Sequence, residues 1–384
     1  AHPRLLLEKT MADIAVIDEG EITCQELFYA LSNGNDLSSI AGIWYKKDGK
    51  IYQNPLRERI KDLDSLPFPA WDLFSMEIYL RNPINIEFGL KSINLCAVRG
   101  CPYCCNYCSH PFGQKVYARS ADNIIAEIKE LKRRYDVEYI TFSGDHFIVN
   151  KKWVLELCDR LRQEELNIKW GAAGRVDLVD KEILKAMKNA GCICLGYGFE
   201  SGSQEIINNM DKRATIEEAE EAIKLTRDAG IYVLSSFMFG MVGETKDTIK
   251  ESVAFIKRMR IPDARLFFTT PYPGTLLYEL AKEMNRLPED EDKYLESLGE
   301  MHNTFLVNLT NFSDDELIRL KKETEDAIQK NFSILTRLGK LWLQLRRRWG
   351  SLKLHYKDEG VLATLRIFLA KLLKVKTSEQ KKDN

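Results

Sequence analysis

The sequence lacks the marks of a secreted, membrane-spanning or nucleic-acid-binding protein. Its formal net charge is −1 over 384 residues, which gives no overall attraction toward nucleic acid. No signal peptide opens the chain, and no apolar run reaches the roughly 20 residues that a spanning helix needs. With 45% hydrophobic and 29% charged residues, the composition is that of an ordinary globular protein. We therefore expect a cytoplasmic protein without a nucleic-acid partner.

The nine cysteines are spread unevenly, and four of them crowd into one short stretch that ends at Cys108. Adjacent residues such as Cys104 and Cys105 are poorly placed for a secreted disulfide framework, so a reducing compartment and metal binding fit better. Within the stretch, Cys101, Cys105 and Cys108 have the spacing C-x3-C-x2-C. Three thiolates on one loop can hold three irons of a [4Fe–4S] cluster and leave the fourth iron open to a substrate or cofactor.

Two alternatives compete with this ligand set. Cys104 could replace Cys105 on an iron, although the register of the spacing favours Cys105. Cys101 and Cys104 could also form half of a structural zinc site, with Cys192 and Cys194 as the other half, in a binding protein without catalysis. Cys192 and Cys194 lie in an apolar strand whose side chains alternate between its two faces, which argues against zinc.

The chain divides into three zones, over residues 1–83, 84–310 and 311–384. The middle zone alternates apolar strands with amphipathic helices. We expect strands over residues 92–97, 139–143, 169–174, 193–199, 232–239 and 264–269. We expect the intervening helices over residues 123–134, 153–164, 181–189, 216–229 and 245–259. Strands this apolar are typical of a parallel sheet covered by helices. The prediction is an α/β fold with a partial TIM-type (β/α)6 barrel, curved but not closed, whose active site lies at the C-terminal strand ends. The cysteine loop follows the first of these strands.

The first zone is a small αβ piece. Residues 12–17 predict a buried strand, and Thr23 is expected to cap a helix that ends near Gly34. Residues 43–52 predict a hairpin that turns at Asp48 and Gly49. This piece has too few strands to close a core by itself.

The last zone is helical and increasingly basic. Ser313 and Glu316 form a capping box at the start of a helix. Residues 341–349 and 361–375 are apolar on one side and cationic on the other, and residues 376–384 predict a disordered tail. One hypothesis is peripheral contact with an anionic membrane and a lipid-like substrate. The other is a docked helix pair with a solvated cationic face.

The cysteine loop, with Tyr107 directly before its third cysteine, resembles that of radical S-adenosylmethionine (SAM) enzymes. The resemblance implies a [4Fe–4S] cluster on Cys101, Cys105 and Cys108, and SAM bound at the open iron. It also implies an external electron donor such as flavodoxin or ferredoxin. In such enzymes an electron from the cluster cleaves SAM, and the resulting radical abstracts a hydrogen from an organic substrate. We expect that substrate to be a small molecule.

Residues at the strand ends match parts of the family's SAM pocket. Glu200 puts a carboxylate acceptor at the end of the fourth strand. Asp145 follows the second strand, where the resemblance implies two adjacent aspartates, and Gly144 departs from that pair. Arg175 is expected either to pair with Asp177 or to reach the SAM carboxylate. On the fifth strand, the resemblance assigns the adenine-supporting role to Ser235, Gly240 and Gly243, with Phe237 and Met238 in the core.

Two loop residues near these ends have open roles. His146 is either a general acid or substrate contact, or a plain loop histidine. Tyr272, in the Pro-Tyr-Pro-Gly turn after the sixth strand, is either a substrate contact or part of a rigid turn.

Residues 1–65 resemble the back half of the cobalamin-binding domain that precedes the barrel in one radical SAM subclass. The front half is missing, and His2 does not replace its cobalt ligand, so we expect an incomplete cobalamin site. The chain opens in mid-pattern at Ala1 and not at Met, which suggests a fragment of a longer protein. The implied function is cobalamin-dependent methyl transfer. The alternative within the family is a non-methylating catalyst such as an oxidative cyclase.

Overall fold

The computed structural model describes residues 3–81, 90–262, 264–298 and 304–330. The basic segments predicted over residues 341–349 and 361–375, the tail 376–384 and His2 lie outside the described residues.

The main sheet of the described chain has seven strands in the order β10-β9-β8-β7-β6-β4-β5. Its strands are β4 (Ser92–Arg99), β5 (Tyr117–Ala118), β6 (Tyr139–Gly144), β7 (Lys169–Gly174), β8 (Cys192–Glu200), β9 (Tyr232–Phe239) and β10 (Arg265–Phe268). Six of them run parallel in sequence order, and the short β5 pairs antiparallel with β4 at one edge. Because β10 and β5 end the sheet at opposite edges, the barrel is partial and open, as predicted.

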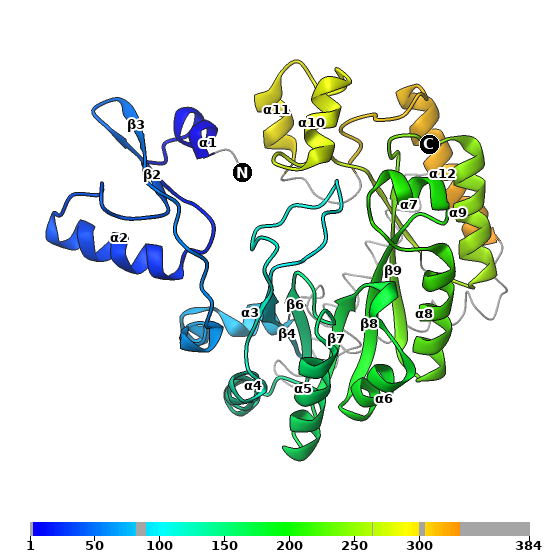
Figure 1. The fold of residues 1–384 in the computed structure, drawn as a ribbon, viewed down its shortest axis with the longest axis horizontal. Helices are drawn as coiled ribbons and strands as arrows, with labels where there is room; N and C mark the ends of the chain where they lie inside the picture. The colour runs from blue at the N-terminus through cyan, green and yellow to red at the C-terminus, as the bar shows by residue number, and fades with distance from the viewer. Residues whose placement is uncertain (1–2, 82–89, 263, 299–303, 331–384) are drawn as a thin grey trace, which may run out of the picture.

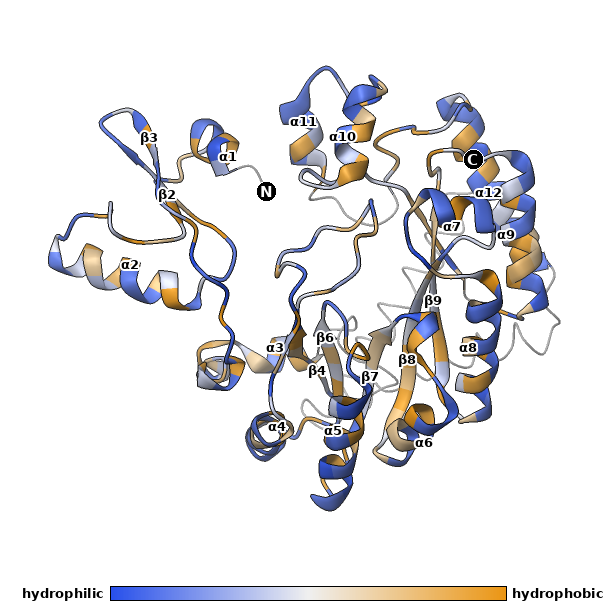
Figure 2. Cartoon of the chain, viewed as in Figure 1, coloured by the Kyte–Doolittle hydropathy of each residue, from blue (hydrophilic) through white to orange (hydrophobic). Residues whose placement is uncertain are grey.

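Helices cover this sheet and follow its strands (Figure 1). They are α4 (Ala121–Tyr135), α5 (Lys151–Gln163), α6 (Lys181–Asn189), α7 (Gln204–Asn209), α8 (Ile216–Asp228), α9 (Lys246–Arg258), α10 (Leu276–Glu283), α11 (Glu291–Ser297) and α12 (Asp314–Lys330). Figure 2 shows helices α5 and α8 with mixed hydrophilic and hydrophobic residues, and the strand β8 largely hydrophobic. The buried side chains of the strands and of most of these helices form a large core, with Trp170, Leu195 and Phe255 among its fully buried members, and α7, α10 and α11 enclose a second, smaller core. Strands covered in this way explain the near-continuous apolar runs of the sequence.

Local sequence sets where the barrel helices begin. Six of them start with a side-chain cap that accepts a hydrogen bond from the backbone N–H three residues later. These caps are Ser120, Asn150, Asp180, Thr215, Thr245 and Thr275. The predicted cap of α12 is also present, since the Glu316 N–H donates to Ser313 Oγ at 3.3 Å. Helix α12 packs on the barrel, because Leu317 and Ile328 belong to its core.

The N-terminal unit lies beside the barrel (Figure 1). It contains α1 (Pro3–Lys9), β1 (Ile14–Val16), α2 (Glu21–Asn33), β2 (Ile43–Lys47) and β3 (Lys50–Gln53). The three strands form an antiparallel sheet in the order β1-β2-β3, and the predicted hairpin turns at Asp48 and Gly49, both with positive φ. Two short 3₁₀ turns and α3 (Met76–Arg81) then lead into the barrel.

The predicted cap of α2 is wrong. The helix begins at Glu21 with Gly20 as its N-cap, and Thr23 lies inside the helix, fully buried. The Thr23 hydroxyl accepts a hydrogen bond from Arg57 Nε at 2.8 Å instead, so a tertiary contact uses the group that the sequence assigned to a cap. Gly34 ends the helix in the left-handed conformation, as expected.

In the part of the chain that the structure describes, every helix is too short or too polar to cross a bilayer.

Candidate active site

The cysteine loop, residues 100–116, leaves the C-terminal end of β4 and returns to it through β5. The two sides of the loop meet at residues 100–101 and 111–113, which we call its neck. The neck is closed, because the Cys101 N–H donates to the Gly113 carbonyl at 3.1 Å. Gly100 is required there: its φ is +92°, and a Cβ would lie 2.0 Å from the Lys115 carbonyl oxygen. The tip is held as well, since Asn106 donates from its N–H to Met210 and accepts from the Leu277 N–H at 2.8 Å. The loop is therefore fixed at both ends over the mouth of the barrel.

The Cys105 thiol affects the pKa of the two other cysteines of the motif. Partial burial, followed by the Cys105 and Cys101 thiols, raises the pKa of Cys108 to about 11, although much of the Cys108 residue is exposed. Burial also raises the pKa of Cys101, and Cys105 adds to that rise. A thiol raises the pKa of a neighbour only at short range, and a bound cation would reverse the effect by favouring the thiolates. The donor set therefore fits an iron–sulfur cluster.

Cys104 is directed elsewhere. Its sulfur accepts a hydrogen bond from Gln114 Nε2 at 3.0 Å. Cys104 is not among the main causes that raise the pKa of Cys101 or of Cys108. This geometry favours Cys105 over Cys104 as the iron ligand.

The alternative zinc ligands are not brought together. Cys192 and Cys194 are buried in β8, with 0% and 2% exposure. Among the described residues, no three His, Cys, Asp or Glu side chains converge in the way that a single metal ion needs. A cluster makes a different demand from zinc, because each cysteine binds its own iron and the thiols need only surround a common space.

Glu200 is the centre of a polar network next to the cysteine loop. Its Oε1 accepts hydrogen bonds from Lys212 Nζ at 2.9 Å and from the Tyr107 hydroxyl at 3.1 Å. Glu200 has a positive φ of 63°, beside an irregularity in the pairing of β8 with β9. A Cβ on Gly198 would lie 2.2 Å from Oε1, so only glycine leaves room for the carboxylate to fold back over the strand. Burial, then Glu200, holds the pKa of Tyr107 well above its usual range, which keeps this hydroxyl a donor.

Asp145 connects the end of β6 to the start of the cysteine loop. Its Oδ2 accepts a hydrogen bond from the Gly100 N–H at 2.7 Å. Gly144 has a φ of +134°, and a Cβ there would lie 2.2 Å from the Val98 carbonyl oxygen. This close approach explains why a second aspartate does not stand at position 144.

Arg175 is already engaged by the protein. It pairs with Asp177 at 2.9 and 3.1 Å and donates to the Lys212 carbonyl at 2.7 Å. Its guanidinium lies 3.6 Å from the centroid of the Tyr103 ring, in the cysteine loop. Of the two expected roles, the ion pair with Asp177 is the one that the geometry displays.

His146 stacks on the same Tyr103 ring, with the centroids 5.5 Å apart. The side chain is 4% exposed, and neither ring nitrogen has a hydrogen-bond partner among the described residues. Burial, followed by the charge of Arg175, lowers the pKa of His146 to about 4. The imidazole is therefore neutral at physiological pH, which removes a protonated His146 as a resting general acid.

The three residues predicted for the adenine-supporting role on the fifth barrel strand, β9, do not lie together. Ser235 lies mid-strand opposite Tyr197, buried, and its hydroxyl has no partner among the described side chains and backbone. Gly240 and Gly243 lie in the turn after β9, both with positive φ. Glu244 shapes this turn by accepting from the Gly240 N–H at 2.5 Å. The turn alone explains both glycines, whereas the Ser235 hydroxyl is left available.

A cavity of about 180 Å³ adjoins Tyr107. Its walls come from the ends of β9 and β10, the turn that contains Tyr272, and the residues around α11. Phe237 is 1% exposed and lies in the core, as expected, and Met238, which lines the cavity, also packs against the core around α7 and α10. The polar groups are the hydroxyls of Tyr107, Thr270, Tyr272, Ser297 and Thr304, and the described lining has no charged side chain.

The family model of the radical SAM superfamily matches residues 95–256, from β4 to the end of α9. A relative from Pyrococcus horikoshii, an uncharacterized methyltransferase, is 35% identical over 293 residues, which are 74% of this chain and 62% of the relative. The chain belongs to the radical SAM superfamily. Membership brings with it the two cofactors of the family, a [4Fe–4S] cluster and SAM, and the cysteine loop fits the first of them.

Two further matches are to a cyclase and to a cobalamin-dependent enzyme. The anaerobic magnesium-protoporphyrin IX monomethyl ester cyclase of Rubrivivax gelatinosus is 29% identical over 285 residues, 72% of this chain and 50% of the cyclase. The solved structure of the cobalamin-dependent S-adenosylmethionine radical enzyme OxsB, with aqua-cobalamin bound, has a TM-score of 0.60 at 17% identity, and covers 99% of this chain and 62% of OxsB. That likeness concerns the fold. The radical SAM chain thus spans 62% and 50% of the lengths of the two curated relatives.

Sequence reasoning missed Lys212, which neutralises Glu200 and is 7% exposed. No motif marks a lone lysine in the stretch Met-Asp-Lys-Arg, and only the fold brings it beside β8.

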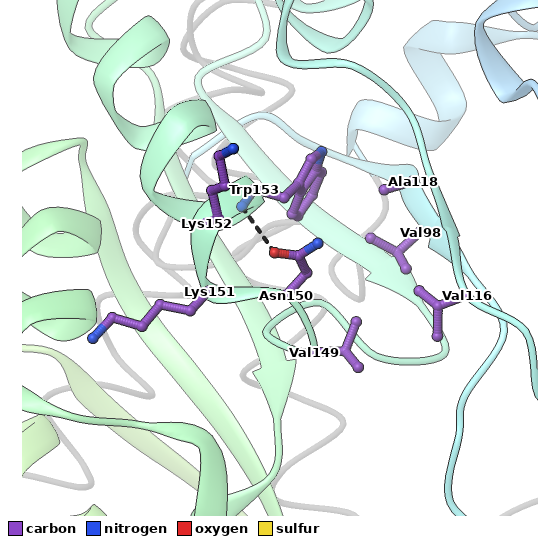
Figure 3. Close-up of a pocket in the computed structure, with 8 residues that line it drawn as sticks. All are labelled: Val98, Val116, Ala118, Val149, Asn150, Lys151, Lys152 and Trp153. Carbon is purple, nitrogen blue, oxygen red and sulfur yellow. Dashed lines mark hydrogen bonds between the residues drawn. The ribbon is translucent and has the colours of Figure 1, made fainter.

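A larger hollow of about 530 Å³ lies at the opposite edge of the sheet of this radical SAM chain (Figure 3). It is formed by valines near β4 and β5 and by the start of α5, where Asn150 caps the helix by accepting from the Trp153 N–H. Lys151 on its rim is paired with Asp180 and Glu182. None of the predicted site residues lines it.

Proposed function

We propose that this chain is the catalytic part of a radical SAM enzyme that reductively cleaves SAM and passes the radical to an organic substrate, and that the whole protein uses it for cobalamin-dependent methyl transfer. One observation carries the proposal: Cys101, Cys105 and Cys108 lie on a loop that is fixed over the C-terminal strand ends, next to the Glu200 network. In this proposal residues 84–310 are the barrel, residues 1–83 the back half of a cobalamin domain with its linker, and residues 311–384 a helical extension.

Cys101, Cys105 and Cys108 would hold the cluster, which when bound supplies the electron that cleaves the sulfonium of SAM. The chain's own residues position SAM and exclude water. Glu200, held by Lys212 and Tyr107, offers a fixed carboxylate edge for the ribose or amino group of SAM. Asp145 fixes the start of the cysteine loop, and its carboxylate is the acceptor that we assign to the SAM amino group.

The remaining candidate residues take supporting roles in this proposal. Ser235 offers an unpartnered buried hydroxyl toward the adenosine, and Gly240 and Gly243 form the turn that follows the same strand. Arg175 holds Tyr103 in place across its ring face, since its donors are largely used by the protein.

The substrate would bind in the cavity beside Tyr107. Its apolar walls and hydroxyl groups favour an uncharged, partly aromatic or aliphatic portion of a small molecule, because burying a charge without a partner is costly. We infer a cytoplasmic protein supplied with electrons by a flavodoxin or ferredoxin. Peripheral membrane contact and a lipid-like substrate remain a hypothesis about segments that lie outside the described residues.

The decisive experiment is anaerobic reconstitution with iron and sulfide. We expect broad visible absorption, an EPR signal after reduction, and 5′-deoxyadenosine release when SAM and a reductant are added. Cys105→Ala should abolish all three, and the matched variant Cys104→Ala should retain them. Absence of iron uptake by the unaltered chain, or equal loss in both variants, would overturn the cluster assignment.

A second candidate function is a non-methylating radical SAM reaction, favoured by the similarity to the cyclase of Rubrivivax gelatinosus. Incubating the longer protein with cobalamin, reductant and SAM labelled in its methyl group separates the two. Label in the product indicates methyl transfer, whereas 5′-deoxyadenosine without labelled product indicates the alternative.

A further inference from the structure

Several polar contacts between the N-terminal unit and the barrel lie at the neck of the cysteine loop. They start from three carboxylates, Asp18, Glu19 and Glu21, which lead from β1 into α2 and which we call the acidic turn. Arg99, the last residue of β4, lies two positions before Cys101. Its Nη1 donates to Glu19 Oε1 at 2.7 Å, and its Nη2 pairs with Glu21.

Glu19 is unusually well fixed for a carboxylate between two units. The side chain is 5% exposed, and Oε2 accepts a hydrogen bond from the Ile60 N–H at 2.8 Å while Oε1 binds Arg99. Hydrogen bonds between charged groups that are shielded from water are stronger than hydrogen bonds between neutral groups. Removing one partner of a buried pair is also strongly destabilising for the other, so Arg99 depends on Glu19 for its position.

The returning side of the loop is held by a second arginine. Arg59 Nη1 donates to the Pro111 carbonyl at 2.7 Å, and its Nη2 pairs with Asp18 at 3.4 Å. Arg99 completes the contact from the other side, because its guanidinium lies 5.1 Å from the centroid of the Phe112 ring. The acidic turn thus binds the two arginines that hold the two sides of the neck.

The neck is where the first cysteine is positioned. The Cys101 N–H donates to the Gly113 carbonyl, and Gly113 follows directly on the two residues that the arginines contact. If the neck opened, Cys101 would move relative to Cys105 and Cys108, which lie beyond it on the same loop.

We propose that the acidic turn is a positioning device for the cluster, which holds the neck of the cysteine loop closed from the N-terminal unit. The inference rests on the proposed function, because it assumes that the loop binds a cluster. It makes Glu19, Arg99 and Arg59 positioning residues, and it makes retention and reduction of the cluster depend on the docking of the N-terminal unit. The acidic turn, residues 18–21, thereby has a role that does not require a bound cobalamin.

The test compares Glu19→Gln with Glu26→Gln in the whole chain after anaerobic reconstitution. Glu26 is the matched control, because it pairs with Arg57 on the same unit and is half exposed, without contact to the cysteine loop. We expect Glu19→Gln to lose iron to a chelator about tenfold faster than the unaltered chain, as for other residues that orient metal ligands. We also expect a shifted midpoint potential and a changed EPR spectrum of the reduced cluster, which a general loss of stability would not produce.

Equal iron loss and equal potentials in the two variants would overturn the proposal. Arg59→Gln tests the other side of the neck and should also speed iron loss. The proposal therefore stays testable even if Glu19→Gln folds poorly. If the unaltered chain takes up no iron, the proposed function itself fails. If it forms the cluster and neither Glu19→Gln nor Arg59→Gln differs from Glu26→Gln, only the positioning role fails.

Discussion

The barrel and the N-terminal unit are stabilised in different ways. The barrel has a large apolar core that runs from α3 through the strands to α12, and a second, smaller core around α7, α10 and α11. The N-terminal unit has a small separate core of Leu27, Ala30, Ile40, Ile43 and Tyr45. Three strands and one long helix bury too little apolar surface for much independent stability, so the unit depends on polar contacts to the barrel. The difference teaches that the barrel fixes the scaffold of the site, while the smaller unit acts on it through a few charges.

The largest expected effect lies in the barrel core. Trp170 is fully buried between Phe142 and Phe147, and its Nε1 donates to the Ala190 carbonyl at 2.8 Å. Trp170→Ala should cost about 4 kcal/mol of unfolding free energy, because it leaves a large cavity. Urea unfolding followed by circular dichroism measures it. Trp44→Ala in the N-terminal unit is the control, and an equal loss there would contradict the difference between the two regions.

A core change in the N-terminal unit should act only locally. Ile43 is fully buried in β2, and Ile43→Ala should cost about 3 kcal/mol within this unit. Hydrogen exchange should show faster exchange in β1–β3 and unchanged protection in β6–β9. Faster exchange throughout the barrel would mean that the two regions unfold together.

The barrel also contains a buried carboxyl that should give it a pH dependence. Burial raises the pKa of Glu244 to about 7, against the hydrogen bonds from the Gly240 and Met241 N–H groups. The folded state then holds a proton that the unfolded chain releases above the ordinary value of 4.5, so stability falls as the pH rises from 4.5 through 7. Between about pH 5 and about pH 7.5 the loss should be about 2 kcal/mol. Thermal unfolding of Glu244→Gln should lack this component, and an identical pH profile would refute the assignment.

The smallest effect should come from a contact between the two regions at the surface. Lys9 on α1 pairs with Asp292 on α11 at 2.5 Å, and both side chains are largely exposed. Exposed pairs contribute little, so Lys9→Ala should leave the unfolding midpoint and iron retention unchanged. A clear loss of iron in this variant would show that any docking contact affects the cluster, not only the acidic turn.

The parts of the fold that follow from periodicity were predictable from the sequence. The strands β7 and β9 and the helix α6 have the expected bounds, because apolar runs and side-chain caps mark their ends. The start of α2 was not predictable, since the Thr23 hydroxyl binds Arg57, which lies far away in the sequence.

The same distinction holds for the site. The spacing of Cys101, Cys105 and Cys108 is local and readable, whereas Lys212 beside Glu200 and Glu19 beside Arg99 are brought together by the fold. Met238 packs against the core as expected, but its place in the cavity wall could not be read from the strand. Which face borders a cavity depends on the helices and loops that cover the sheet.

Gly144 sets a limit for protein engineering. A designer who grafts the paired aspartates of the family pattern onto this chain would place a side chain against the Val98 carbonyl, in a backbone conformation that only glycine adopts readily. Such a graft would first require a redesigned backbone at Val98 and Gly144. These two residues pair β4 with β6, so the end of the strand that leads into the cysteine loop would have to be rebuilt.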